Sequence, residues 1–573
     1  MIRVIFIVWL YFFVVTVSAP LFAQTQGVAD DGNIEKEEAL RERLEKGKGK
    51  PPEIITEEKL GVEKPILSLP AEKILIKNIS LIGVTLLSPE EINDIVLPYE
   101  NKELSLIEMQ EVANLITGAY HEKGYATSGA YITRINSEQG MVEMRVIEGI
   151  TGEIKIEGNR YFKTSLLKKK ITLKEGEPFN NKVLEEDLHK INKHPDRKAR
   201  AVAKAGREPG VTDIILQVKD NLPLHVNFGW ENYLGRYFSN NRYSNAFVHN
   251  NLTGHDDILK IEGKLAEADT QKMVTIHYTV PFSENVEIGF QATRKDDDFV
   301  EEYQVLDLEK KTRKYAVFVN RYLVKQADCE FSANLSFNYI DAFGYLLSNK
   351  TSSDRVRFLN MGFDLNRSDK FGRTIVIQDT GFGIPDIMGG LSSKDDRASR
   401  RGAGGKFIKT NLTLARQHKL ISGCSLLLKS QFQLSSRVLT TLTAEDKFRL
   451  GGISNVRGYP PSEAEGDAGY ALTIGCAFAP YGVPKGLKVP FSKAKLYDAL
   501  KLLIFYDWAN ARLRNPRVGE EKSRTLRSVG WGVRMNLPEA FSVRVDIGWP
   551  LDKEPTDHKR LHTWVSVSKG FHF

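Results

Sequence analysis

The sequence predicts a β-barrel membrane protein, in which a transmembrane antiparallel β-barrel of ~16 strands follows two small α+β modules and a polar N-terminal helix. Three observations carry this prediction. A short apolar run opens the chain, one β-α-α-β-β pattern occurs twice in residues 74–220, and short alternating stretches of apolar and polar residues fill residues 221–573. Such alternation after an export signal is typical of barrels that cross an outer membrane.

Residues 1–23 have the features of a secretory signal peptide. Arg3 precedes an apolar run over residues 4–17, and small residues that include Ala19 and Ala23 follow. A charged start, a short apolar core and small residues suit export and cleavage. A membrane anchor is the alternative, although the run is short and leads into polar sequence. No later apolar run reaches ~18 residues, so no transmembrane helix is expected beyond it.

Residues 24–73 predict a polar helix and a linker. Asn33 can cap a helix over residues 34–46, whose acidic first turns suit the helix dipole. Only Leu40 and Leu44 form an apolar strip, so the helix has little to bury in an apolar core. We expect either a disordered tail, which the composition favours slightly, or a detachable helix inside an aqueous cavity, followed by an extended linker.

Residues 74–150 and 151–220 repeat the same pattern. In the first copy, residues 74–82 predict a strand, and Ser88-Pro89-Glu90-Glu91 predicts the start of a helix. The second copy predicts a helix over residues 181–192 and two strands behind it. Two copies at a period of about 75 residues predict two small α+β modules in tandem.

Residues 221–573 predict the barrel. Val274, Ile276 and Tyr278 interleave with Thr275, and the same alternation recurs in many short stretches. Arginine and aspartate on the polar faces would be costly against lipid, so those faces must line a wet lumen. At about 22 residues per strand and turn, the length gives ~16 strands. The alternative is a soluble array of β-sandwiches.

The last predicted strand, residues 565–573, carries aromatic residues on one face, among them Phe571 and Phe573. An aromatic final residue suits recognition by the barrel-assembly machinery of a Gram-negative cell. Phe571 and Phe573 are therefore the predicted barrel-assembly signal, with outer-membrane lipid as the expected surroundings of the barrel.

One loop stands out among these strands. It runs from Gly451 to Tyr459, begins with paired glycines and ends at Pro460. Glycine tolerates positive φ and proline ends strand pairing, so the stretch predicts a loop. Arg457 lies in it between small or apolar neighbours and can present a fork of donors to a carboxylate. A solvated surface turn is the alternative.

A candidate carboxylate for Arg457 lies fifty residues further on, in residues 502–509. Alternation along this stretch places Ile504 and Trp508 on one face and Asp507 on the other. Asp507 therefore points into the lumen if the bulky face meets lipid. A loop that folds inward could bring Arg457 to Asp507. An ion pair in a confined lumen contributes more to stability than one on an open surface, provided that both charged groups keep their partners.

These residues converge on a resemblance. The two modules resemble polypeptide-transport-associated (POTRA) domains. His194-Pro195-Asp196-Arg197 with Pro209-Gly210-Val211-Thr212-Asp213 is similar to the second POTRA domain of two-partner secretion outer-membrane transporters, the TpsB or ShlB/FhaC/HecB haemolysin secretion and activation family. Val456-Arg457-Gly458-Tyr459 matches the VRGY motif of their inward-folded sixth loop, and the segment 505–509 resembles the strand motif whose Asp pairs with that Arg. Ala509 departs from the usual Gly.

The resemblance implies the function and the location. The functional loop would be Val456, Arg457, Gly458 and Tyr459, and Arg457 and Asp507 would form a lumenal ion pair. The N-terminal helix would plug the pore at rest. The protein would export a large partner protein, often a haemolysin or adhesin, in unfolded form across the Gram-negative outer membrane, with the POTRA domains in the periplasm.

Other functions find less support in the sequence. A barrel-assembly insertase of the same superfamily would usually carry more modules and lack the plug helix, and a plain porin needs no periplasmic modules. The net charge is only +7 and the sequence has no stripe of basic residues, so we do not expect the protein to bind nucleic acid. Cys329, Cys424 and Cys476 are far apart and odd in number, which predicts neither a disulfide framework nor a metal site. We expect no catalytic residues, metal or cofactor, and interpret His194 as a turn residue.

Overall fold

The computed structural model describes residues 31–45, 53–56 and 73–572, apart from gaps at 236, 301–303, 306, 327, 401, 422, 437–441, 485, 490–493, 517–519 and 538–540. The predicted signal peptide and Phe573 lie outside the described residues, as does most of the predicted linker. The chain forms two compact units, one of Gly49–Pro223 and one of Met1–Lys48 with Leu224–Phe573. None of the described helices combines the length and the apolar composition needed to cross a membrane.

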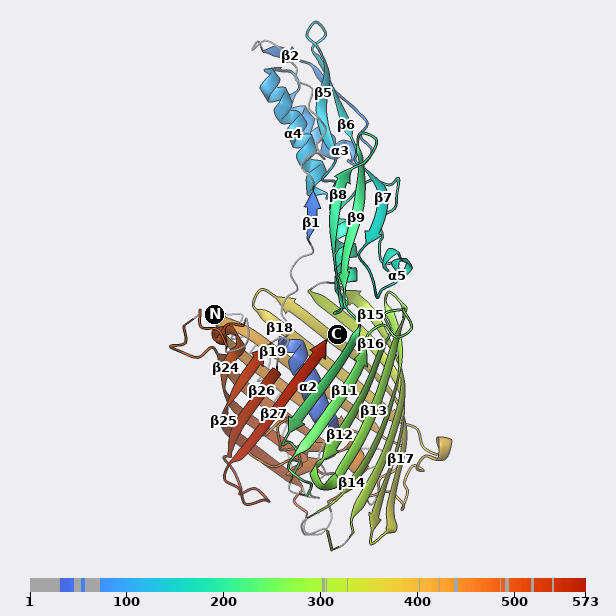
Figure 1. Ribbon diagram of the computed structural model, residues 1–573, viewed down its shortest axis with the longest axis vertical. Helices are drawn as coiled ribbons and strands as arrows, with labels where there is room; N and C mark the ends of the chain where they lie inside the picture. The colour runs from blue at the N-terminus through green and yellow to red at the C-terminus, as the bar shows by residue number, and fades with distance from the viewer. Residues whose placement is uncertain are drawn as a thin grey trace. The chain divides into compact units, whose positions relative to one another are not determined.

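The first module, labelled in Figure 1, has one long helix against a small sheet. Its elements are β2 (Ile74–Ile76), β3 (Asn78–Ile82), α3 (Pro89–Val96), the 3-10 turn η1 (Leu97–Tyr99), β4 (Lys102–Leu104), α4 (Leu106–Glu122), β5 (Gly129–Asn136) and β6 (Met141–Ile147). The sheet order is β3-β6-β5. Ser88 and Ser105 form capping boxes that start α3 and α4, and α4 buries Met109, Val112 and Ile116 against the sheet.

The first predicted strand of this module is two strands. The prediction of one strand over residues 74–82 is wrong at Lys77, because the backbone N–H groups of Lys77 and Asn78 both donate to the carbonyl of Gly140. The chain bends there, β2 pairs with β4, and β3 pairs in parallel with β6.

Glu148, just after β6, ties the first module together. Its carboxylate accepts hydrogen bonds from Thr85 N at 2.7 Å, Leu86 N at 2.9 Å and the Tyr120 hydroxyl at 2.7 Å. Burial opposes ionisation, yet these hydrogen bonds and one from the Thr85 hydroxyl hold the pKa of Glu148 below its usual range. The charged carboxylate thus links α4 to the loop before α3.

The second module repeats the pattern and adds a strand that the sequence did not reveal. Its elements are β7 (Ile150–Glu157), α5 (Thr164–Lys168), α6 (Asn181–Asn192), β8 (Arg197–Ala205) and β9 (Val211–Asp220). A short strand from the predicted linker, β1 (Ile54–Thr56), pairs in parallel with the edge of β8, so the sheet order is β1-β8-β9-β7. Ala201 N donates to Glu53 O at 3.1 Å, and Ile54 packs on the module core.

The remainder forms a closed antiparallel barrel of sixteen strands, as predicted (Figure 1). The strands are β10 (Leu224–Glu231), β11 (Arg242–His249), β12 (Ile258–Ala266), β13 (Gln271–Ser283), β14 (Val286–Asp298), β15 (Glu309–Lys325), β16 (Cys329–Leu346), β17 (Asn349–Asp369), β18 (Gly372–Gly383), β19 (Ile408–Ile421), β20 (Cys424–Ser435), β23 (Ala468–Phe478), β24 (Leu500–Arg512), β25 (Ser523–Leu537), β26 (Phe541–Pro550) and β27 (His562–His572). Short helical turns lie between strands at η2 (Glu267–Asp269), η4 (Ile387–Gly389), η5 (Ala444–Asp446) and α7 (Leu496–Ala499). Strand β10 pairs with β27 over seven residue pairs and closes the barrel.

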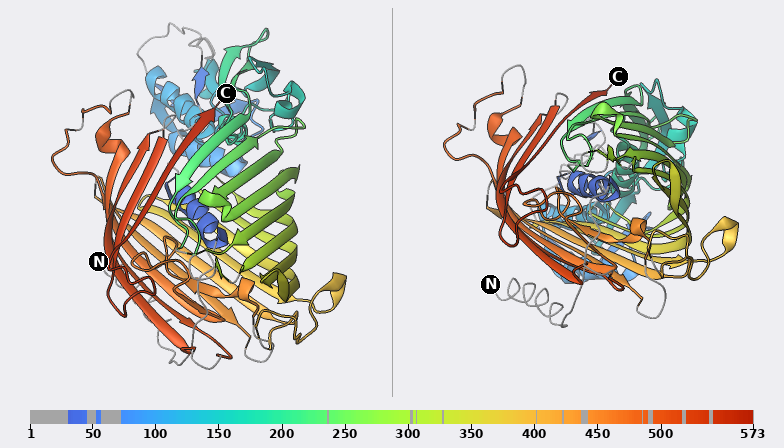
Figure 2. Two further views of the ribbon diagram at one scale, coloured as in Figure 1. Left: turned by 60° about the horizontal axis from the view of Figure 1, so that its bottom comes forward. Right: turned by 90° about the horizontal axis from the view of Figure 1, so that it is seen from below.

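The two faces of the barrel wall differ as the alternation predicts. Large apolar side chains stand exposed on the outside, for example Phe228, Val274 and Phe363, where lipid would cover them. The lumenal faces carry buried charged side chains instead, such as Asp507 and Asp546. Helix α2 (Asp31–Glu45) lies inside the barrel, as both views in Figure 2 show.

Candidate functional site: a loop and a helix inside the barrel

The stretch from Gly451 to Tyr459 belongs to the loop between β20 and β23. Two short paired strands, β21 (Phe448–Leu450) and β22 (Ala464–Gly466), bracket it. Val456 and Tyr459 are fully buried in an apolar cluster that includes residues of β23, β24 and β25. The stretch therefore lies against the inner wall of the barrel and is not a solvated surface turn.

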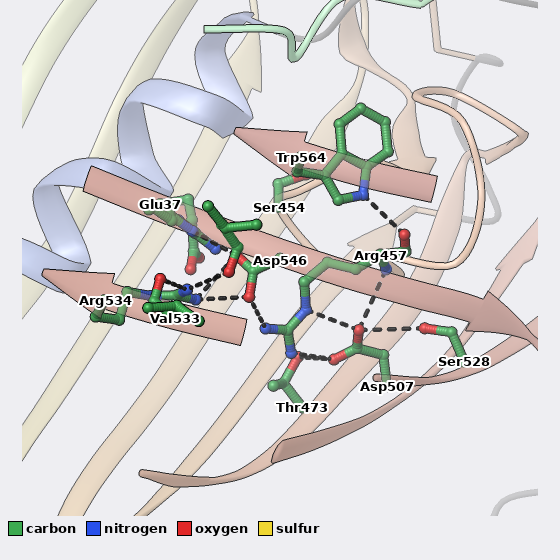
Figure 3. Close-up of polar contacts among 12 residues, drawn as sticks. Glu37, Ser454, Arg457, Thr473, Asp507, Ser528, Val533, Arg534, Asp546 and Trp564 are labelled. Atoms are coloured by element: carbon green, nitrogen blue, oxygen red, sulfur yellow. Dashed lines mark hydrogen bonds and ion pairs between the residues drawn. The ribbon is translucent and has the colours of Figure 1, made fainter. Parts of the chain in front are cut away.

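The structure brings Arg457 and Asp507 together (Figure 3). The Arg457 side chain donates from Nε to Asp507 Oδ2 at 3.0 Å and from Nη2 to Oδ1 at 2.8 Å, and its backbone N also donates to Oδ2 at 3.2 Å. The hydroxyls of Thr473 and Ser528 donate to the same carboxylate. Both carboxylate oxygens are thus satisfied, as a fully buried charge requires.

A second carboxylate faces the same arginine. Nη1 of Arg457 lies 3.5 Å from Asp546, which also accepts from Arg534 at 2.7 and 2.9 Å and from Arg544 Nε at 2.6 Å. The guanidinium of Arg457 also stacks on the ring of Phe505, 3.3 Å from its centroid. Alternation in residues 541–549 places Arg544 and Asp546 on the polar face, but sequence reasoning did not connect them with Arg457.

Glycine 458 lets the loop approach the wall closely. A Cβ added to Gly458 would lie 2.6 Å from Ser528 Cβ and 2.7 Å from the backbone of Trp549. Beside it, the indole N–H of Trp564 donates to the carbonyl of Arg457 at 2.7 Å, and the Tyr459 hydroxyl accepts from Asp552 N at 3.2 Å. The backbone around Arg457 is therefore fixed independently of its side chain.

Further buried carboxylates in the same loop were missed. Glu463 accepts from Arg524 and from the backbone and hydroxyl of Thr556. Asp467 accepts from Arg400 at 2.9 Å and from the backbone N–H of Leu442. The sequence could have revealed these two pairs, because Glu463 and Asp467 follow the loop motif closely. A loop that folds into a barrel must pair its buried charges with partners on the wall.

Helix α2 contacts the lumen mainly through ion pairs. Glu35 accepts from Lys264 of β12 at 3.1 Å, Glu37 from Lys429 of β20 at 2.7 Å, and Arg43 pairs with Asp364 of β17. Fewer apolar contacts add to these: Ile34 packs with Tyr233, Ile453 and Trp564, and Leu40 and Leu44 pack with Ile375 and Ala415. The helix is therefore held by groups that water can replace, together with a narrow apolar strip.

Space remains beside the helix. A polar cavity of about 480 Å³ lies beside the C-terminal end of α2 and is lined by Arg43, Asp364 and side chains of β14 to β17, such as Asn320 and Asn334. A cavity with this lining suits water.

Lys429 connects the helix to the loop. Its ammonium donates to Glu37 Oε2 of α2 at 2.7 Å and to the carbonyl of Ser454 at 2.6 Å. The two elements inside the barrel thus share one cation.

The other residues singled out in the sequence lie away from this cluster. Phe571 pairs with Val226 across the closure of the barrel, faces outward and meets Phe228 edge-on. His194 lies in the turn before β8, where its ring accepts a hydrogen bond from Asp196 N and packs on Phe162. In the part of the chain that the structure describes, no three His, Cys, Asp or Glu side chains are placed to hold a metal ion.

Comparison with protein families matches the two modules and the barrel. The profile described as "POTRA domain, ShlB-type" matches residues 74–149, and a second POTRA profile, described as "Surface antigen variable number repeat", matches residues 150–216. The profile described as "Haemolysin secretion/activation protein ShlB/FhaC/HecB" matches residues 210–473, and the Omp85 superfamily domain matches residues 398–573. The chain belongs to the ShlB/FhaC/HecB family. It is an outer-membrane transporter with periplasmic POTRA domains, and it exports a partner protein by two-partner secretion.

Individual relatives of this transporter are distant in sequence. The heme/hemopexin transporter protein HuxB of Haemophilus influenzae is 22% identical over 501 residues, 84% of each chain. The outer membrane transporter CdiB of Dickeya dadantii is 21% identical over 482 residues, 82% of this chain and 81% of the relative.

Solved structures share the fold. CdiB from Escherichia coli aligns with a TM-score of 0.67 at 17% identity and covers 96% of this chain and 100% of its own. BamA from Haemophilus ducreyi lacking POTRA domains 1–3 aligns with a TM-score of 0.54 at 15% identity, over 87% of this chain and 100% of its own.

Proposed function

We propose that the transporter passes its partner through the barrel lumen as an unfolded chain, and that α2 plugs this route at rest. The observation that carries the proposal is the way α2 lies in the lumen: its contacts are largely ionic, and a polar cavity lies beside its C-terminal end. An element held in this way can leave for the aqueous periplasm without exposing a large apolar face.

Channel recordings test the plug. Removal of residues 24–50 should raise the single-channel conductance in planar bilayers, because the deletion removes the whole helix. A conductance equal to that of the intact protein would mean that the segment does not block the lumen. The amount of heat-modifiable barrel in the membrane serves as the control for insertion.

We further infer that the POTRA domains capture the unfolded partner by strand addition. This mode of binding relies on backbone hydrogen bonds and so tolerates many sequences. The edge of β8 supports the proposal because it accepts β1 as an additional strand. An exported segment would then compete with β1 for this edge.

Two variants test capture. Deletion of Lys73–Gly149 should abolish export while the barrel still inserts. Ile55→Pro should weaken the pairing of β1, since proline lacks the N–H group that a strand needs, and an extended peptide from the partner should then bind several-fold more tightly. Ile55→Ala, which keeps the backbone N–H group, is the matched control. If Ile55→Pro leaves peptide affinity unchanged, capture does not occur at this edge.

The partner is proposed to be a large secreted protein of the haemolysin or adhesin type, and the chain to act as a transporter rather than as an enzyme. A barrel-assembly insertase is the weaker candidate, because it would have no use for a helix that closes the lumen. A gene for a very large secreted repeat protein beside this one would support the assignment, and co-expression of the two would show whether the partner reaches the medium only with this transporter.

We also propose that the barrel-assembly machinery inserts the protein into outer-membrane lipid through its C-terminal strand. The outward position of Phe571 supports this role. Phe571→Ala together with Phe573→Ala should lower the amount of folded barrel in the membrane several-fold, whereas Phe228→Ala, on the neighbouring strand, should not. Equal losses in both variants would point to packing rather than to recognition.

A further inference from the structure

Two of the three cysteines meet on the barrel wall, although they are far apart in the sequence. The Sγ atoms of Cys424 and Cys476 lie 3.6 Å apart, across 52 positions of the chain. Cys424 opens β20, and Cys476 lies on the paired strand β23, opposite Leu426. We propose that these two thiols form a disulfide that joins β20 to β23.

The position of the pair favours oxidation. Strand β10 follows the periplasmic POTRA domains directly, so the antiparallel order places the start of β20 and the end of β23 at the periplasmic end of the wall. Both thiols are half-buried and reduced in this structure. The periplasm is a compartment in which disulfides form and persist.

The geometry needs only a small adjustment. A disulfide bond is about 2.05 Å long, so the two sulfurs must approach by about 1.5 Å. The hydrogen-bonded pairing of β20 with β23 ends beside the two cysteines. Cys424 is the first residue of β20 and follows the turn at Gly423, whose φ is 79°. Rotation of the two side chains at a strand end can supply this movement.

The oxidant is a protein disulfide in the periplasm. One thiolate of the pair attacks it, which forms a mixed disulfide and releases one sulfur of the oxidant; the other cysteine thiolate then attacks the mixed disulfide. The products are the Cys424–Cys476 disulfide and the reduced dithiol of the oxidant, which receives two electrons and two protons.

The bond would join the two strands that carry the lumenal loop. Residues 436–467, with Arg457 among them, connect the end of β20 to the start of β23 at the opposite end of the wall, so the disulfide would close a covalent ring that contains both strands and the whole loop. The loop could then change position without separating these strands. The bond would also restrict the unfolded chain and stabilise the barrel.

Peptide mapping tests the bond in the full-length protein from outer membranes. Thiols are blocked by alkylation without reductant, and the protein is digested with trypsin. We expect peptides 420–429 and 458–485 joined, and separated by reductant, while Cys329 in peptide 326–350 is alkylated from the start. In Cys424→Ser, Cys476 should become open to alkylation. Alkylation of both cysteines in the unreduced wild type, before and after treatment with oxidised glutathione, would overturn the proposal.

A stability measurement tests the stabilising role. The temperature at which the barrel loses its compact form on electrophoresis should fall by several degrees when wild type is reduced. Cys424→Ser should match the reduced wild type and no longer respond to reductant, and Cys329→Ser should behave like the wild type. A wild-type temperature that is insensitive to reductant would overturn this role.

Discussion

The loop that carries Arg457 and helix α2 occupy the same lumen, yet they are held in different ways. Arg457 and Asp507 are 6% and 0% exposed, and each makes several hydrogen bonds. Among the ion pairs of α2, Arg43 and Asp364 are 31% and 28% exposed, whereas Glu37 and Lys429 are 14% and 5% exposed. Exposed pairs contribute little to stability, whereas breaking a buried pair is costly. The C-terminal part of α2 is therefore held more weakly than the loop, which supports the proposal that α2 leaves the lumen while the loop stays on the wall.

The strongest test of the fixed loop is Asp507→Ala. It leaves the buried Arg457 guanidinium without its main partner, which typically costs about 3–5 kcal/mol. We expect secretion of the partner into the medium to fall more than a hundredfold, with barrel still present in the membrane. Immunoblots of the medium and of heat-modifiable barrel measure both quantities.

The control for Asp507→Ala is Asp269→Ala, which breaks an exposed pair with Lys272 and should leave secretion unchanged. Arg457→Ala should impair secretion in the same way, and the double variant Arg457→Ala/Asp507→Ala should lose less than the sum of the two, since the residues touch. Additive losses, or wild-type secretion by Arg457→Ala, would show that the contact has no role in transport.

A smaller effect is expected from Gly458→Ala. The added methyl group would meet Ser528 and the backbone of Trp549 at less than 3 Å, so the loop must shift off the wall while its charges remain. Overpacking of this kind costs about 1–3 kcal/mol, and secretion should fall by about tenfold. Gly486→Ala is the matched control, because no atom lies within 4 Å of the added Cβ. Equal secretion by the two variants would mean that the close approach is unimportant.

Asp364→Asn tests the releasable helix. Arg43 loses its ionic partner, and because the pair is partly exposed the loss is about 0.2–1 kcal/mol. The fraction of time in the open state in planar bilayers should therefore rise by up to about fivefold. Asp379→Asn is the control, since Asp379 accepts a hydrogen bond from Asn360 of the wall. A rise in both variants would indicate a general effect of lumenal charge.

Glu148 provides a third case, a carboxylate held by neutral donors outside the barrel. Its lowered pKa stabilises the first module at pH values above about 4.3, the pKa of an unfolded glutamate, and this stabilisation is lost as the pH falls through the folded value. Glu148→Gln should lower the unfolding temperature of the periplasmic domains by a few degrees at pH 7, and the difference from wild type should shrink below pH 4. Glu111→Gln is the exposed control. A difference that persists at low pH would show that the carboxylate charge is not involved.

Alternation along the chain predicted which face of each strand is lumenal, and this was enough to place Asp507 inside the barrel. It could not predict that Asp546, Arg534 and Arg544 surround the same loop, because alternation gives the face of a strand but not its position around the barrel. The contact between Cys424 and Cys476 was not predicted for a related reason, because it depends on the register of two strands that a long loop separates in the sequence.

The sequence did not predict the short strands for another reason. Strand β1 has only three residues and follows two prolines, so no periodicity could be counted, and its pairing depends on a free edge of β8 that only the folded module creates. The break between β2 and β3 depends likewise on Gly140, a residue far along the chain. Helix α6, expected over residues 181–192, and the two modules were predicted because their signals are local and repeated.

Helix α2 has a mechanical consequence that follows from where its contacts lie. It spans about 22 Å and bonds to β12, β17 and β20, strands from well-separated parts of the barrel circumference, with Ile34 packed near the closure of the barrel. The helix therefore connects distant parts of the barrel wall and opposes deformation of the barrel cross-section from round to oval. Its departure would widen the route and also make the wall more compliant, so that the cross-section could follow the shape of the chain passing through it.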